Sequence, residues 1–257
     1  MELIKKQIHM NQWKGNVTTQ ITLDDDFIVP DTMDDMEQVM LDTGEIQIET
    51  VKNQGDKVAV KGKLEFQVLY RRESGGLQTL GGNIPFEEVV NVPGLEEKDY
   101  VGLNWMLEDL NTDMINSRKL GVQAIITLQV RVETLRDVEA AVDVDMESQS
   151  RGAGAGLSDT DASGQVQVET LKRTATAAAI AVRRKDTYRI KEELSLTGGK
   201  PNIGQLLWRE MKLRDITVKP LDGRLHLDGE LSVFVIYSAE DENMPMQWME
   251  ETPVSYT

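Results

Sequence analysis

Two histidines are the side chains of this sequence best suited to acid–base chemistry or metal binding. His9 lies in an N-terminal stretch of mixed polar and apolar residues, and His226 falls on the polar phase of an alternating segment. Neither has a candidate ligand at the fixed spacing that a metal or catalytic site requires. We therefore interpret both as surface histidines, and we predict no catalytic residue and no metal site.

Two further stretches could be mistaken for ligand sites. Asp24, Asp25 and Asp26 cluster the oxygens that hard cations prefer, but the central glycine and closing glutamate of a calcium loop are missing. The tract from Arg151 to Gly156 is rich in glycine, yet it lacks the Lys-Ser/Thr ending and the strand–helix frame of a phosphate loop. We interpret the first stretch as a solvated acidic corner and the second as a linker, and we predict no cofactor.

Composition narrows the function further. The chain has 257 residues, of which 40% are hydrophobic and 28% charged, with a net charge of −16 and no cysteine. A strongly acidic surface repels phosphate, which argues against nucleic-acid binding and against docking on anionic lipid. The absence of cysteine removes disulfides and thiol nucleophiles and fits a reducing compartment. With few nucleophile–base candidates left, we predict a protein that is not an enzyme.

The same composition predicts a cytoplasmic location. The first 20 residues have no apolar signal-peptide core, and no apolar run approaches the ~20 residues of a membrane span. We therefore expect no direct insertion into a membrane.

Alternating hydrophobicity predicts a mainly-β fold. In residues 58–70, 120–132 and 225–237 apolar residues recur at nearly every second position, with mostly polar residues between them. This period is typical of strands with one buried face. We expect β-sandwich-like packing of such strands.

Two segments predict short helices. After Asp31, a plausible N-cap, and after Pro201, apolar residues recur at helical spacing. The residues of these two stripes are Met33, Met36, Val39 and Met40 in the first, and Ile203, Leu206 and Leu207 in the second. The predicted fold is a tandem pair of β-sandwich-like modules, each with one short helix.

The prediction of two modules in tandem rests on an internal repeat in the sequence. Shifting the numbering by 167 brings Thr50-Val51-Lys52 onto Thr217-Val218-Lys219. The same shift brings Gly62, Leu64, Val68 and Tyr70 onto Gly229, Leu231, Val235 and Tyr237. We predict a first module over residues 1–146, a flexible acidic and Gly/Ala-rich linker over 147–164, and a second module over 165–257. A second copy of equal length would extend to about residue 303, so we expect the second module to be incomplete at its C-terminus.

An incomplete module predicts a candidate interaction surface. Uncovered apolar strand residues and unpaired strand edges favour association with another chain. Met244 and Met246 lie near Trp248 in a predicted hairpin, and methionine-rich surfaces adapt to partners. The predicted surface comprises Val233, Val235, Ile236, Met244, Met246 and Trp248, and self-association is one expected outcome.

Several motifs together resemble a known family. The run from Val60 to Tyr70, then Ile84–Glu88, Leu107–Leu110 and Ile115–Leu120, is similar to the SPOCS domain. In the second half, Lys185–Leu194, Lys200–Ile203 and Leu206–Trp208 are similar to the same domain. This domain is the repeated module of the SipL family of spore-coat morphogenetic proteins. The resemblance covers nearly the whole chain outside the linker.

The resemblance implies a function in endospore coat assembly. Family members carry tandem SPOCS modules followed by a LysM domain, and act in the mother-cell cytosol at the forespore surface. They bind a coat morphogenetic ATPase of the SpoIVA type, largely through the LysM domain, which this sequence does not contain. The implied function is a non-catalytic scaffold or adaptor that helps tether the coat to the forespore by protein–protein interaction.

Two other functions remain open on the residues alone. β-Sandwiches often bind sugars on aromatic platforms, so a carbohydrate-binding or cell-wall-associated module is the alternative. The four tryptophans, Trp13, Trp105, Trp208 and Trp248, are not clustered in sequence. A hydrolase would need a carboxylate pair in a deep cleft, which the sequence does not locate.

Overall fold

The structure of the protein is a computed structural model. It describes residues 2–145, 198–241, 244–251 and 255–256, with single positions and short stretches between 173 and 196. The predicted linker, residues 147–164, lies outside the described residues. Within the described ranges every regular element is a β-strand, and the sheets are antiparallel, as predicted.

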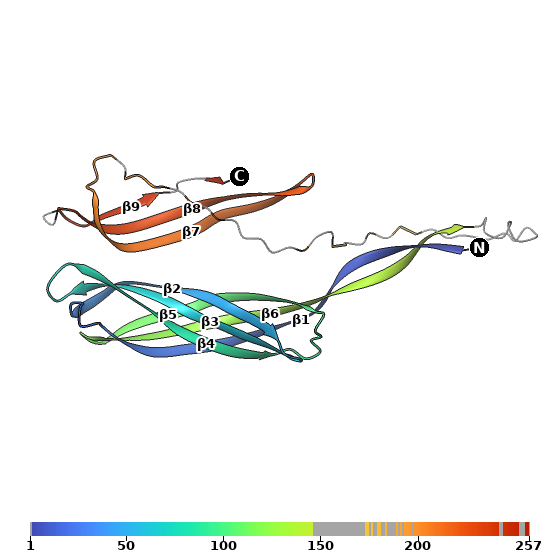
Figure 1. Cartoon of the computed structure of the whole chain (residues 1–257), viewed down its shortest axis with the longest axis horizontal. Coiled ribbons are helices and arrows are strands. Elements are labelled where there is room, and N and C mark those ends of the chain that lie inside the picture. The colour runs from blue at the N-terminus through green and yellow to red at the C-terminus, as the bar shows by residue number, and fades with distance from the viewer. Residues whose placement is uncertain are drawn as a thin grey trace, which may run out of the picture.

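Six strands form a two-layered sandwich (Figure 1). One sheet has the order β1-β6-β5 and the other the order β2-β3-β4. The strands of the first sheet are β1 (Glu2–Ile28), β6 (Lys119–Asp145) and β5 (Tyr100–Asn116). Those of the second are β2 (Met36–Asn53), β3 (Lys57–Arg72) and β4 (Leu77–Asn91). Beyond the sandwich, β1 and β6 continue as a twisted two-stranded ribbon.

The two long alternating segments of the first half form the centre of this sandwich. Val60, Leu64 and Val68 point inward from β3, and Leu120, Ile126 and Leu128 point inward from β6. All six are fully buried. Burying a branched side chain of this size contributes about 1.5–3 kcal/mol. The period-two pattern therefore identified the core of the sandwich from sequence.

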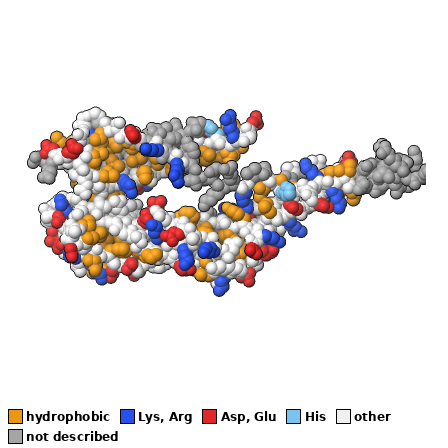
Figure 2. All heavy atoms as spheres, in the orientation of Figure 1, with side chains coloured by type: hydrophobic (Ala, Val, Ile, Leu, Met, Phe, Trp, Pro, Cys, Tyr) orange, Lys and Arg blue, Asp and Glu red, His pale blue; other side chains and the backbone are white. Residues whose placement is uncertain are grey.

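Four strands make up a third sheet, which lies beside the sandwich (Figure 1). They are β7 (Ile203–Leu221), β8 (Arg224–Ala239), β9 (Gln247–Glu251) and β10 (Ser255–Tyr256). β8 pairs with β7 along one edge, and with both β9 and β10 along the other. Figure 2 shows hydrophobic side chains gathered over this third sheet.

The prediction of one short helix in each half is wrong for the described residues. The residues of the first stripe lead into or lie in β2, and Ile203, Leu206 and Leu207 lie in β7. In β2, register shifts against β3 fall between Met36 and Gln38 and between Val39 and Leu41. Each shift places an extra residue on β2, so inward positions recur every three residues instead of two. A bulged strand therefore imitated the spacing of a helix.

The third sheet repeats this irregularity. Its register shifts in β7 fall between Ile203 and Gln205 and between Leu206 and Trp208, which is the β2 pattern displaced by 167 residues. Tyr70 donates its hydroxyl hydrogen to the carbonyl of Asp34, and Tyr237 donates to that of Pro201, again 167 residues on. β7 and β8 thus have the local geometry of β2 and β3.

Candidate interaction surface

The two histidines each lie beside a carboxylate. His9 Nδ1 lies 2.5 Å from Asp137, and His226 Nε2 lies 3.1 Å from Asp228. Both imidazoles pair with a single carboxylate, and among the described residues no group of three or more acidic, histidine or cysteine side chains could hold a metal ion.

The acidic run lies within strand β1 and not at a corner. Asp24 accepts a hydrogen bond from Gln123, and Asp26 pairs with Lys119, both across the β1–β6 ladder. Residues 24–26 continue the β1–β6 pairing without a break. Because these carboxylates point from an extended strand toward separate partners, they do not converge on a cation.

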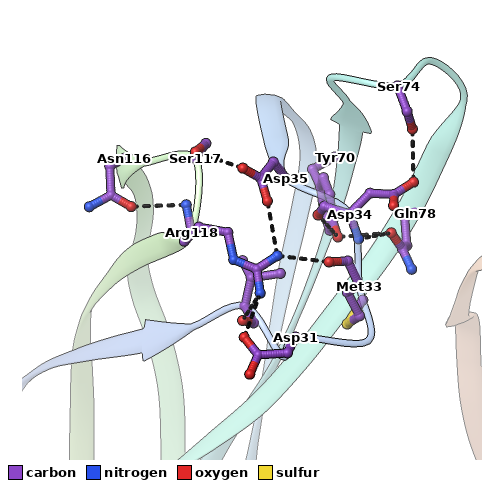
Figure 3. A network of polar contacts seen from close by, with 11 residues as sticks. Asp31, Met33, Asp34, Asp35, Tyr70, Ser74, Gln78, Asn116, Ser117 and Arg118 are labelled. Atoms are coloured by element: carbon purple, nitrogen blue, oxygen red, sulfur yellow. Dashed lines mark hydrogen bonds and ion pairs between the residues drawn. The ribbon is translucent and has the colours of Figure 1, made fainter.

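A polar clamp closes one end of the sandwich (Figure 3). The guanidinium of Arg118 donates to the carbonyls of Met33 and Val29 at 2.7 and 2.9 Å, and pairs with Asp35 and Asp31 at 3.0 and 3.2 Å. The planar fork of arginine suits this convergence of acceptors. Arg118 thereby ties the β1–β2 connection to the β5–β6 turn. We interpret the clamp as structural, since its acceptors belong to the fold itself.

The neighbouring part of the clamp centres on Tyr70. Its hydroxyl donates to the Asp34 carbonyl at 3.1 Å and lies 3.0 Å from Gln78, and Asp34 also accepts from Ser74 and Arg72. Burial, followed by the negative charge of Asp34, raises the pKa of Tyr70 above its usual value. The tyrosine stays neutral and acts as a hydrogen-bond donor within the β3–β4 hairpin.

An ion pair between Lys14 and the buried carboxylate of Asp99 fixes the loop before β5. Lys14 contacts Asp99 at 2.7 Å and Glu96 at 2.8 Å. Burial opposes ionisation of Asp99, but hydrogen bonds from Lys14, the Glu96 amide and Thr134 outweigh it and hold the Asp99 pKa below its usual value. The same contacts raise the pKa of Lys14. Both groups therefore remain charged near neutral pH.

The sandwich and the third sheet meet through their outer faces. Leu69 lies on the outward side of β3, at only 1% exposure, and packs with Leu207 and Trp208 of β7. Leu77, Phe234 and Ile236 surround these three residues. The Thr79 hydroxyl also donates to the Leu207 carbonyl. We call these residues the inter-sheet cluster: Leu69, Leu77, Thr79, Leu207, Trp208, Phe234 and Ile236.

The six residues of the predicted interaction surface are divided among β8, β9 and the connection between them, with Met244 and Met246 in that connection. Val233 and Val235 belong to the side that packs with Tyr237, Met249 and the stretch around Leu194. Ile236 is paired with Trp248 across the β8–β9 ladder and belongs to the side of the inter-sheet cluster. Alternate residues of a strand point to opposite faces, so these six side chains do not form one surface.

The exposed members of the set are concentrated around β9. Met244, Met246 and Trp248 are 48%, 44% and 61% exposed. Lys200 lies over the Trp248 ring at 5.3 Å, and Phe234 lies 6.3 Å away on the β8 strand. A tryptophan with two neighbouring methionines is a composition typical of protein-binding surfaces.

Sequence reasoning did not single out Leu69 or Trp208 as contact residues. The alternation of β3 could have indicated Leu69. It is apolar, whereas Glu65, Gln67 and Arg71 on the same outward side of the strand are polar. A single large apolar residue on the polar phase of a half-buried strand indicates a second contact surface.

Comparison with protein families agrees with the motifs. Residues 35–115 match the family model described as SipL, SPOCS domain. Residues 35–115 therefore form a SipL-like SPOCS domain. No curated protein and no solved structure matches it.

The match spans β2, β3, β4 and nearly all of β5, and these strands include Tyr70, Arg72 and Gln78 of the clamp. The SipL SPOCS domain indicates involvement in spore-coat assembly, and the SipL family consists of non-enzymatic coat morphogenetic proteins. Within the described ranges no helical segment has the length and hydrophobicity needed to span a bilayer.

Proposed function

We propose that this SipL-like protein is a non-catalytic scaffold or adaptor of the spore coat. In this role it helps to hold the coat morphogenetic ATPase at the forespore surface, on its mother-cell side, through protein–protein contacts. The observation that carries the proposal is the exposed Met244, Met246 and Trp248 surface on a protein with a SPOCS domain. Large apolar side chains of this kind are the usual anchors of protein interfaces.

We further propose that β7–β10 belong to a second module of the same type, over residues 165–257, joined to the first by the linker 147–164. The shared register shifts of β2 and β7 support this, as do the equivalent hydroxyl bonds of Tyr70 and Tyr237. Limited proteolysis should cut first within 147–164 and release a fragment that retains β1–β6. Cleavage within β3 or β6 before the linker would contradict this organisation.

The adaptor proposal predicts two linked results. Purified protein should bind the purified coat ATPase, and sporulating cells that lack the protein should show a coat detached from the forespore. Trp248→Glu should weaken binding, whereas Met106→Glu, at an equally exposed methionine on β5, should not. An intact protein that neither binds the ATPase nor affects coat attachment would refute the proposal.

Sugar binding is the weaker alternative. The rings of Trp13 and Trp248 each have a cation placed over them, Arg131 at 5.0 Å and Lys200 at 5.3 Å. A cation over an aromatic face competes with the stacking that sugar recognition uses. A glycan array distinguishes the two functions, since specific binding to a cell-wall glycan would favour the alternative.

A further inference from the structure

The inter-sheet cluster joins two residues of the third sheet, which we call the pair, to three residues of the sandwich, which we call the seat. The pair is Leu207 and Trp208 of β7, which are 5% and 4% exposed. The seat consists of Leu69 on β3 with Leu77 and Thr79 on β4. The pair therefore comes from the third sheet and the seat from the sandwich.

Strand register shows that each sheet carries both halves of this contact. In the sandwich the outward row across β2, β3 and β4 is Leu41, Leu69 and Thr79. In the third sheet the corresponding row across β7, β8 and β9 is Trp208, Ile236 and Trp248. Leu41 in β2 is thus the counterpart of Trp208, and Ile236 and Trp248 are the counterparts of Leu69 and Thr79.

The sandwich has a pair that no seat covers, and the third sheet has a seat that no pair occupies. Met40 and Leu41, the counterparts of the buried pair, are 47% and 41% exposed. We call them the free pair. Ile236 is partly buried, and Met244 and Trp248 are 48% and 61% exposed. We call Met244 and Trp248 the free seat; Ile236, which lies beside them, belongs to the inter-sheet cluster.

We propose that the free pair of one molecule docks on the free seat of a second copy of this chain. The contact between the sandwich and the third sheet is the template, since it joins the same two kinds of surface from equivalent strand positions. The free seat carries an exposed indole where the seat already in use has a threonine, because Trp248 stands at the position of Thr79. Each molecule carries one free pair and one free seat, so the contact is head-to-tail and can add further copies.

This inference goes beyond the adaptor function and does not depend on the ATPase. Self-assembly would let a coat protein cover an area larger than one molecule. The chain carries a net charge of −16, which opposes association at low ionic strength. An apolar contact should therefore strengthen when salt screens the charges, and at ~0.15 M the screening length is about 8 Å.

The test is complementation between two variants of the full chain. Leu41→Glu removes the free pair and keeps the free seat, whereas Trp248→Glu does the opposite. Sedimentation velocity should show concentration-dependent association of the unaltered protein, weakened at least about tenfold in either variant alone. An equimolar mixture should form a one-to-one complex, because each variant supplies the half that the other lacks.

Controls separate this contact from loss of folding and from general stickiness. Met106→Glu on β5 introduces the same charge at a distant exposed methionine, and it should associate like the unaltered protein. Circular dichroism should show the same β content in all variants. A monomer at every concentration, or a mixture that remains as two separate monomers, would overturn the proposal.

Discussion

Truncating Leu69 measures how much the inter-sheet cluster contributes to stability. Leu69 is 1% exposed, yet it points away from the core of the sandwich. Leucine-to-alanine changes at fully buried sites cost about 2–5 kcal/mol, depending on how far the cavity collapses. This cluster is small, with three buried residues, so we expect a loss near the lower end, about 2–3 kcal/mol.

Leu41 provides a matched control. It lies directly across from Leu69 in the β2–β3 ladder and points to the same outward side, but it is 41% exposed. Leu41→Ala should change the free energy of unfolding by less than about 0.5 kcal/mol. Urea unfolding at low protein concentration, followed by circular dichroism, compares the two variants without contributions from association.

A double-mutant cycle tests the contact itself. Leu69→Ala and Trp208→Ala should be non-additive, with a coupling energy of about 0.5–3 kcal/mol, because the two side chains share one cluster. The interpretation of the cluster is refuted if Leu69→Ala costs no more than Leu41→Ala. It is also refuted if the two changes add within about 0.3 kcal/mol, as independent sites do.

Three further predictions concern the sandwich. Arg118→Ala should destabilise it by about 2–4 kcal/mol, because two backbone carbonyls and two carboxylates lose their donor, and Arg118→Lys should recover only part of this in denaturant unfolding. Gly62→Ala should lower the free energy of unfolding by about 1–3 kcal/mol, since its Cβ would lie 2.6 Å from the Gln47 carbonyl oxygen. The Cβ of Gly15→Ala meets open space, so the melting temperature of that variant should be unchanged or raised. The depressed pKa of Asp99 contributes stability that is fully present above the ordinary value of 3.8 and is lost as pH falls through the lower folded-state pKa. Asp99→Asn should therefore flatten the decline in melting temperature below about pH 5, and an unchanged acid profile would contradict this.

The sequence predicted the core better than it predicted the contacts. Strict alternation between residues 58 and 70 identified the inward side of β3, because a half-buried strand has no other solution for its apolar residues. Met36 and Val39 led to the wrong prediction of a helix, because their spacing depends on how β2 pairs with β3. Two register shifts changed their spacing to three, and a shift arises from pairing with β3, which a local window of sequence does not contain.

The clamp and the docking residues were beyond sequence reasoning for a related reason. Arg118 reaches acceptors more than 80 residues earlier in the chain, and its motif gave no hint of the carbonyls it would meet. Val233 to Tyr237 form an apolar run, and the prediction placed Val233, Val235 and Ile236 on one surface because they are close in sequence. A strand that is apolar at successive positions is typically covered on both sides, which would have divided the run into two surfaces.

The two faces of β8 therefore have different functions. Val235 and Tyr237 pack with Met249 and Leu196 on one side, which is the side equivalent to the sandwich core around Val68 and Tyr70. Ile236 faces the other way, where β3 carries Leu69. The inner side therefore stabilises the unit and the outer side joins units. The outer side of β3 carries Leu69 among mostly polar residues, whereas the outer side of β8 and β9 carries Phe234, Ile236 and Trp248. Trp248 is 61% exposed, so the third sheet has apolar outer surface that its contact with the sandwich does not cover, and this excess is what makes it a docking surface.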